Sequence, residues 1–321
     1  MEYGQIAGVN KPVSRLVLGT MIVSSDDPEK SFALLDEFVT AGGTTLDSAH
    51  VYGGGKSERG IGLWMERRGN REQVVVISKC SHPNADRKRV TPYDIASDLH
   101  DSLARLRTMY IDLYFLHRDD SELPVGPIVE ALNEHHAAGK IRAFGGSNWT
   151  HQRLEEANAY AAKHGLVPFS ISSPNLSLAD QQQSPWGPDC ITISGPKHAD
   201  ARCWYAEHKM PIFAWSSLAR GFFSGRLNRE NFKEAALDPS VVKAYCYEEN
   251  FQRLERAAEL AKEKGLSVPQ VALAWVLEQP IDIYALIGAA NREEIAANVG
   301  ALGLKLTPAE CEWLDLRRER R

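Results

Sequence analysis

The sequence predicts a single (β/α)₈ barrel, and three observations support this fold class. Short apolar runs of strand length alternate with longer segments of helical periodicity, which is the pattern of βα units around a parallel sheet. Eight such runs occur along the 321 residues. No Pro-, Gly- or Ser-rich linker divides the chain, so we expect residues 1–321 to form one domain with one closed barrel.

The eight strand candidates are all rich in aliphatic and aromatic residues, as buried parallel strands are. In chain order they are RLVLG (15–19), TTLD (44–47), VVVISK (74–79), IDLYFLH (111–117), IRAFGGS (141–147), PFSIS (168–172), PIFAWS (211–216) and IYALIG (283–288).

The segments between these runs carry helix signals. Residues 26–43 have an acidic, Pro-containing start, apolar residues near one face and a Gly-Gly stop. Residues 91–108 begin with a Thr that caps a helix and a Pro at its first position, and their apolar residues recur at helical spacing. Both segments are predicted to be helices that pack on the sheet.

Composition and charge exclude several classes of protein. Hydrophobic residues are 43% and charged residues 25% of the chain, which is ordinary globular usage. The net charge of −5 gives no electrostatic footprint for nucleic acid or anionic lipid, so a small-molecule partner is expected. No segment has the length of a membrane helix, and residues 1–19 lack the pattern of a secretion signal.

The cysteines indicate a reducing compartment. There are five, at wide spacing and without a CxxC pair, which argues against both a disulfide framework and a zinc site. No HxH or HExxH spacing joins the histidines, so no metal is expected. We therefore expect a cytoplasmic protein.

Two long connections, 173–197 and 219–247, lack a strong pattern. Long connections in a compact domain are commonly functional, and in a barrel those after strands six and seven lie over the mouth of the active site. The first strand is followed by Gly19-Thr20-Met21 rather than by a G-x-G-x-x-G fingerprint. Any dinucleotide must therefore be bound in another way than in a doubly wound fold.

Polar residues stand where the second, third and fourth strands end, which is where barrel enzymes place their reactive groups. They are Asp47, Lys79 and His117, and Tyr52 follows closely among glycines. An ammonium near a phenol stabilises the phenolate and lowers the phenol pKa toward the working range. Lys79 would act so on Tyr52, Asp47 would hold Lys79, and His117 would donate a hydrogen bond to a substrate oxygen.

These residues resemble the Asp-Tyr-Lys-His tetrad of the aldo-keto reductases, which reduce carbonyls with a nicotinamide cofactor on a (β/α)₈ barrel. The strings LDSAHVYGGGKSE, VVVISK and DLYFLH carry the tetrad, and GGSNW, WSSLARGFFSG and IGAANREEIAANVGAL resemble the cofactor segments. The resemblance covers nearly the whole chain. It implies Tyr52 as general acid, Lys79 as the group that lowers its pKa, Asp47 as the partner of Lys79, and His117 as the group that orients the carbonyl.

The resemblance also implies where the nicotinamide binds. Ser147 and Asn148 would hydrogen-bond the carboxamide, and Asp47 is counted among the cofactor contacts. Trp215 would lie against the nicotinamide ring, since its flat apolar surface suits stacking.

The rest of the cofactor would follow the last two strands. Ser216, Leu218 and Arg220 would line the pyrophosphate, where a guanidinium can donate two bonds to phosphate oxygens. Gly288 through Asn298 would wrap the adenosine, with Asn298 on the adenine.

Two departures from the family pattern stand out. Where the family commonly has a Gln at the end of strand six, this chain offers Ile171 or Ser172, with Pro174 following. At the subsite for the 2′-phosphate, Arg292 is followed by Glu293-Glu294, which would repel a phosphate unless they point away. We favour NADP(H) on the habit of the family, with NAD(H) as the open alternative.

The predicted function is interconversion of a small carbonyl compound and its alcohol. His82, Trp186 and the polar residues 180–183 suggest a polar, sugar-like carbonyl, although Trp186 can equally pack within its loop. The alternative is a non-catalytic, cofactor-sensing or accessory protein, because the same fold serves as an accessory subunit of potassium channels. The complete tetrad favours the enzyme, and no pattern indicates an oligomeric state.

Overall fold

Eight parallel strands close into a barrel in the computed structural model, which describes residues 1–233 and 238–321. The strands are β3 (Leu16–Gly19), β4 (Thr45–Asp47), β5 (Val75–Cys80), β6 (Ile111–Leu116), β7 (Ile141–Ser147), β8 (Ile171–Ser173), β9 (Ile212–Ala214) and β10 (Ile283–Ile287). Each pairs with the next in chain order, and β10 pairs with β3 to close the ring. The predicted (β/α)₈ barrel is thus confirmed.

All eight predicted strands are present, but some of them start or end at other residues than predicted. The run that starts at Pro168 forms a strand only from Ile171, and the run that starts at Pro211 only from Ile212. Proline has no N–H to donate to a strand ladder, so neither proline joins the ladder and the paired strand starts after it. The ladder of β9 stops at Ala214, and Ser216 two residues later has a positive φ of 53°.

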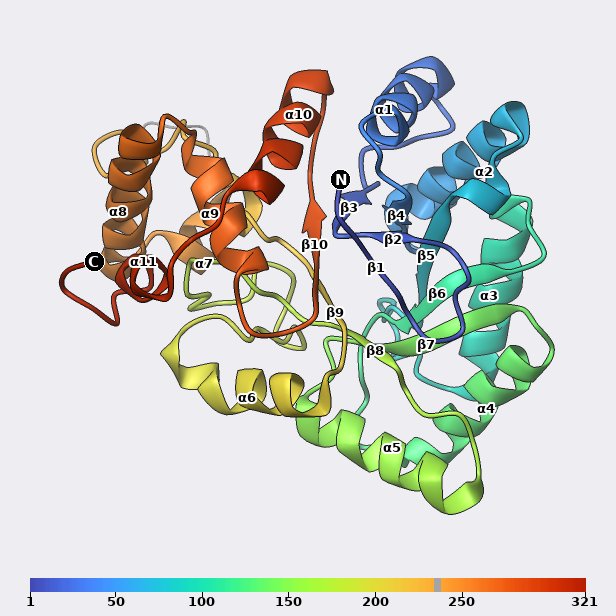
Figure 1. Cartoon of the computed structure of the whole chain (residues 1–321). Helices are drawn as coiled ribbons and strands as arrows, with labels where there is room; N and C mark the ends of the chain where they lie inside the picture. The colour runs from blue at the N-terminus through green and yellow to red at the C-terminus, as the bar shows by residue number, and fades with distance from the viewer. Residues whose placement is uncertain (234–237) are drawn as a thin grey trace.

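Helices surround the barrel, as Figure 1 shows. They are α1 (Pro28–Thr40), α2 (Lys56–Arg68), α3 (Pro92–Leu106), α4 (Val125–Ala137), α5 (His151–His164), α6 (Ala199–His208), α7 (Pro239–Tyr245), α8 (Glu248–Lys264), α9 (Val268–Leu277), α10 (Arg292–Gly300) and α11 (Pro308–Leu314). Both helices predicted from capping signals are present: Asp27 accepts from the N–H of Lys30, and Thr91 from that of Asp94.

An N-terminal hairpin closes one end of the barrel. Its strands β1 (Tyr3–Gly4) and β2 (Val13–Ser14) pair antiparallel and cross the barrel opening in Figure 1. Ile6, Val9 and Val13 are buried in the cluster that also holds the inward-facing barrel residues. The amino ends of the strands are therefore sealed by apolar side chains.

The two long connections follow β8 and β9, the sixth and seventh barrel strands, as predicted. The second includes residues 234–237, which lie outside the described residues. Its remainder is more ordered than expected, because residues 239–245 form α7 with Asp238 as its capping residue. Within the described ranges, no helix is long and apolar enough to cross a bilayer.

Candidate functional site

The four tetrad residues meet at the carboxyl ends of three neighbouring strands. Asp47 is the last residue of β4, Lys79 is the second-last of β5, and His117 directly follows β6. The Nζ of Lys79 donates to Oδ1 of Asp47 at 2.6 Å and to the backbone oxygen of Ser48 at 2.9 Å. It also lies 3.3 Å from Oη of Tyr52. One ammonium thus joins the carboxylate and the phenol.

Glycines bring Tyr52 back over the barrel. Gly53, Gly54 and Gly55 follow it with φ of 58°, 63° and 87°, a left-handed run that residues with a Cβ rarely adopt. This turn leads directly into α2. Arg105 on α3 anchors the loop, because its Nη1 donates to the backbone oxygen of His50 at 2.9 Å.

Burial and the ion pair set the protonation states of the phenol and the ammonium. Burial opposes the charge of Lys79, but the negative charge of Asp47, together with the interaction with Tyr52, outweighs it and raises the pKa of Lys79. Burial raises the pKa of Tyr52 above its ordinary value, and the opposing charge of Lys79 only reduces this rise. Near neutral pH the phenol therefore carries its proton and the amine is charged.

His117 is held as a neutral imidazole. Burial lowers its pKa well below the ordinary value, and the positive charges of Lys79 and Arg118 lower it further. Its ring meets the rings of Tyr52 and His82 edge to face, with centroids 5.8 and 4.9 Å away. Its buried Nδ1 has no hydrogen-bond partner among the described residues. A neutral imidazole beside the phenol can donate its N–H to a substrate oxygen, while the phenol of Tyr52 supplies the proton that is transferred.

Ser147 and Asn148 are the residues predicted to hold the carboxamide. They lie at the end of β7, the next strand around the barrel: Ser147 is its last residue and Asn148 follows it. Ser147 and Asn148 are both buried, and Asn148 has a positive φ of 61°. In this structure they are bonded to protein groups. The Oγ of Ser147 donates to the backbone oxygen of Ser173 at 3.0 Å, and Nδ2 of Asn148 donates to that of His117 at 3.1 Å. Oδ1 of Asn148 accepts from the N–H of Ile191.

The residues predicted for the ring and the pyrophosphate follow β9. Ser216 and Arg220 both have a φ of 53°, so the chain turns sharply around Leu218. The buried Nε1 of Trp215 and Nη1 of Arg220 have no partner among the described residues. The other arm of Arg220 bonds Asp238 at 2.7 Å, and its guanidinium lies 3.9 Å from the ring centre of Trp186. An unsatisfied guanidinium nitrogen in a turn is suited to a phosphate oxygen.

The predicted adenosine segment follows β10, the strand next to β9. Nδ2 of Asn298 donates to the backbone oxygen of Gly288 at 3.3 Å, which folds α10 back over the turn. The carboxylate of Glu294 accepts from the N–H of Ala290 at 2.9 Å and so turns toward the start of its own helix. The side chain of Arg292 is 76% exposed, and its Nε lies 3.6 Å from Glu37.

The candidate cofactor residues thus come from β7, β9 and β10, and the tetrad comes from β4, β5 and β6. Strands β4 to β7 are contiguous around the barrel, and β9 and β10 follow after β8. The unpartnered nitrogens of Arg220 and Trp215 and the exposed cation of Arg292 fit an extended dinucleotide laid from the tetrad toward α10.

Sequence reasoning considered the wrong residue at the end of strand six. Ser172 lies within β8, where its Oγ bonds the hydroxyl of Tyr205 at 2.8 Å, and Ile171 is buried in the barrel interior. Ser173 is the residue that ends the strand. The backbone oxygen of Ser173 accepts from Oγ of Ser147 and from the N–H of Asn148. A backbone oxygen therefore contacts these two residues at the strand end where the family commonly has a Gln side chain.

Sequence reasoning also missed Arg118, which is buried beside the tetrad. The signal was available, because this arginine directly follows His117 at the end of the fourth barrel strand.

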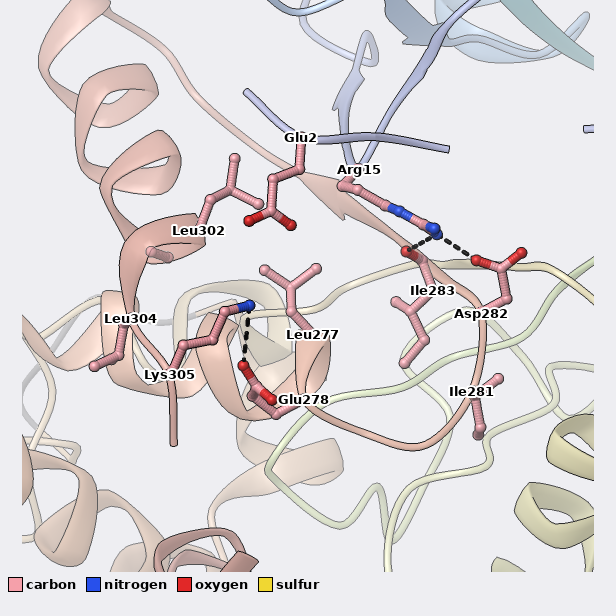
Figure 2. Close-up of a pocket in the computed structure, with 11 residues that line it drawn as sticks. Glu2, Arg15, Leu277, Glu278, Ile281, Asp282, Ile283, Leu302, Leu304 and Lys305 are labelled. Atoms are coloured by element: carbon pink, nitrogen blue, oxygen red, sulfur yellow. Dashed lines mark hydrogen bonds and ion pairs between the residues drawn. The ribbon is translucent and has the colours of Figure 1, made fainter. Parts of the chain in front are cut away.

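A surface pocket of about 200 Å³ lies at the opposite end of the barrel, near the starts of β3 and β10. Figure 2 shows two ion pairs among its lining residues, Arg15 with Asp282 and Lys305 with Glu278. It contains none of the tetrad. In the described part of the chain, no three His, Cys, Asp or Glu side chains gather as metal ligands would.

Comparison with known proteins gives one consistent result. The model of the aldo/keto reductase family matches residues 15–316. An uncharacterized oxidoreductase of Bacillus subtilis, YrpG, is 31% identical, with 95% of this chain and 92% of the relative covered. The aryl-alcohol dehydrogenase [NADP(+)] of Phanerodontia chrysosporium is 30% identical, with 93% of this chain and 77% of the relative covered.

A solved structure agrees with these relatives. The glycerol dehydrogenase AKR11B4 from Gluconobacter oxydans superposes with a TM-score of 0.78 at 26% identity, over 97% of this chain and 93% of that one. The family match spans the whole barrel, from β3 to the last helix. The chain therefore belongs to the aldo/keto reductase family and is an NAD(P)-dependent oxidoreductase.

Proposed function

We propose that the protein interconverts a small carbonyl compound and its alcohol, with Tyr52 as general acid in reduction and general base in oxidation. One observation carries the proposal: the Lys79 ammonium, paired with Asp47 at 2.6 Å, lies 3.3 Å from the Tyr52 hydroxyl in a buried site. The neutral His117 stands beside them. We also propose that residues 1–321 form a single domain.

When bound, the nicotinamide supplies or accepts the hydride at the substrate carbon. Tyr52 keeps its proton because burial raises its pKa, so it can donate that proton to the substrate oxygen as negative charge develops there. Lys79 then faces a phenolate, which its charge stabilises. Asp47 keeps Lys79 charged and in place, and His117 orients the substrate oxygen with one N–H.

For the cofactor we propose NADP(H) in preference to NAD(H). Ser147, Asn148 and Trp215 would hold the nicotinamide, and the nitrogen of Arg220 that lacks a partner among the described residues would take a pyrophosphate oxygen together with Ser216 and Leu218. Binding of the carboxamide requires Ser147 and Asn148 to exchange the protein hydrogen bonds described above.

At the other end, Gly288 through Asn298 would hold the adenosine, and Arg292 would pair with the 2′-phosphate. The exposure of Arg292 supports this assignment, because its side chain can reach a ligand, whereas the carboxylate of Glu294 at Ala290 would oppose a phosphate placed there. A relative whose name specifies NADP(+) supports it too.

For the substrate we propose a small polar carbonyl compound, a keto-sugar among them. The structure changes the grounds for this choice. Gln181 is buried and donates to the hydroxyl of Tyr245, and Trp186 packs under Arg220, so both are engaged with protein groups. The polar groups beside His117 are instead His82 and Arg118.

The proposed mechanism is tested with purified protein, a panel of aldehydes and keto-sugars, and NADPH or NADH, following oxidation of the cofactor. Tyr52→Phe is expected to lower kcat by about 10²- to 10⁴-fold while cofactor binding, measured by quenching of tryptophan fluorescence, is retained. A Tyr52→Phe protein that turns over like the wild type would show that another group supplies the proton.

A further inference from the structure

A second charged side chain lies in the substrate region, outside the tetrad. Arg118 directly follows His117, and only 8% of its surface is exposed. Its backbone is fixed, because Nε1 of Trp149 donates to the Arg118 oxygen at 3.2 Å. Its Nη1 donates to the backbone oxygen of His117 at 2.9 Å.

Arg118 differs from the other arginines that are buried to the same degree. Arg153 and Arg253 are 8% and 4% exposed, and each pairs with a carboxylate, Asp119 and Asp315 respectively. Arg118 forms no ion pair with any residue in 1–233 or 238–321. A buried charge is costly unless a counter-charge accompanies it, and the described residues supply none to Arg118, so an anionic ligand would be stabilised beside this guanidinium.

The carboxylates next to Arg118 in sequence are engaged elsewhere. Asp119 bonds Arg153 at 3.2 Å, and Asp120 pairs with Lys88 at 3.1 Å. The other cation of the site, Lys79, is already paired with Asp47. The charge of Arg118 therefore remains available to a ligand.

The positive charge of Arg118 acts on several residues of the candidate site. Its positive charge acts on Tyr52, His82, His117 and Cys190, which come from four separate loops at the carboxyl face of the barrel. Together with the bond from its Nη1 to the backbone oxygen of His117, this places Arg118 on the face of the barrel that carries Tyr52 and His117.

We propose that Arg118 binds an anionic group of the substrate, so that the preferred substrates are carbonyl compounds that carry a carboxylate. This inference rests on the proposed function and names its substrate class. A planar guanidinium can donate two parallel bonds to a carboxylate, and a single positive charge without an ion-pair partner among the described residues matches a single negative one. The carboxylate would be held while Tyr52 and His117 receive the carbonyl oxygen.

The test compares 4-formylbenzoate with its methyl ester, which keeps the aldehyde and the ring but lacks the charge. We expect the wild-type protein to favour the acid by about tenfold or more in kcat/KM, chiefly through a lower KM. In Arg118→Gln the ratio of acid to ester falls to about one, and Arg118→Lys, which keeps the charge, restores part of the preference.

Arg67→Gln is the matched control, because it removes an exposed arginine of α2 that is paired with Glu29 and leaves the partners of Asp119 and Asp120 in place. It is expected to keep the wild-type ratio. Thermal unfolding of each variant separates a lost contact from a lost fold. A wild-type protein that turns over both aldehydes without preferring the acid overturns the inference and leaves the proposed function intact.

Calorimetric titration of 4-formylbenzoate and its ester into the protein tests the anion site without turnover. Binding that favours the acid and depends on Arg118 supports the site even if neither aldehyde is reduced, and the proposed function fails only if the whole panel of aldehydes and keto-sugars is inert as well. Equal binding of acid and ester overturns the inference whether or not the enzyme is active.

Discussion

Nζ of Lys79 lies 2.6 Å from Oδ1 of Asp47, and each side chain is only 4% exposed. The two residues come from neighbouring strands, and the pair is completed by bonds to Ser48 and Tyr52. Neither charge can turn to water, so each depends on the other. This mutual dependence makes the pair a test of both stability and chemistry.

Replacing Asp47 with Asn is expected to destabilise the protein by about 3–5 kcal/mol, because Lys79 is left buried without its counter-charge. Chemical denaturation measures this loss. Asp26→Asn is the matched control, since Asp26 and Lys56 form an ion pair with side chains 62% and 52% exposed. Exposed pairs contribute about 0–1 kcal/mol. Equal losses in the two variants would contradict the argument.

The pH dependence of reduction follows from the pKa of Tyr52. Reduction needs the protonated phenol, and burial raises the pKa of Tyr52 above its ordinary value. We expect kcat for reduction to persist to about pH 10 and to fall only above it. Oxidation needs the phenolate and is expected to rise with pH over the same range. A loss of reduction centred near pH 7 would show that a different group is the acid.

Lys79→Met is expected to move this transition. Lys79 lowers the pKa of Tyr52 while burial raises it, so removal of the ammonium leaves burial opposed by less positive charge. The pKa of Tyr52 then rises, and the fall in reduction moves to higher pH, with kcat reduced because the phenolate loses its stabilising charge. Measured pH profiles of the variant and the wild type decide the direction; a shift to lower pH would refute it.

Cofactor preference depends on Arg292 in our proposal. Titration with NADPH and NADH, followed by quenching of tryptophan fluorescence, is expected to show tighter binding of NADPH. Arg292→Gln is expected to weaken NADPH binding by about tenfold, because a charge-assisted bond to the 2′-phosphate is lost. NADH binding serves as the internal control and is expected to stay constant. Tighter NADH binding by the wild type would identify NAD(H) as the cofactor.

Gly145→Ala is expected to destabilise the barrel near the site. A Cβ at Gly145 would overlap the backbone oxygen of Ile171 on the neighbouring strand, so the two strands would have to separate. Overpacking of this kind costs about 1–3 kcal/mol or more. Gly303→Ala is the control, because a Cβ there has no atom within 4 Å. Thermal unfolding of both variants measures the difference, and a Gly145→Ala protein as stable as the control would refute the expected clash.

The fold was predictable because buried parallel strands have continuous apolar sequences, and eight such runs identify a barrel. Strand ends were less predictable, since they depend on local backbone chemistry such as the prolines at 168 and 211. The convergence of Asp47, Lys79 and His117 followed from their positions at the ends of neighbouring strands.

Other features depend on three-dimensional surroundings that the sequence does not contain. The sign of the net pKa shift of Tyr52 required the balance between burial and the Lys79 charge. The lack of an ion pair at Arg118 became visible only when every described carboxylate had a position. The helix at 239–245 was missed because α7 is short and lies in a segment without clear periodicity, although Asp238 and Pro239 carry a helix-start signal.

The apolar hairpin covers the amino ends of the barrel strands, so a ligand can approach the tetrad only from the carboxyl ends. Ile6, Val9 and Val13 fill the barrel opening at the amino ends of the strands. Removal of the first fourteen residues would therefore admit water to the interior beside Val17 and Tyr284. Fusions at the N-terminus consequently extend from the side away from the tetrad. We therefore expect that the loop after β8 can be exchanged to alter substrate choice while the N-terminal segment is retained as a structural part of every variant.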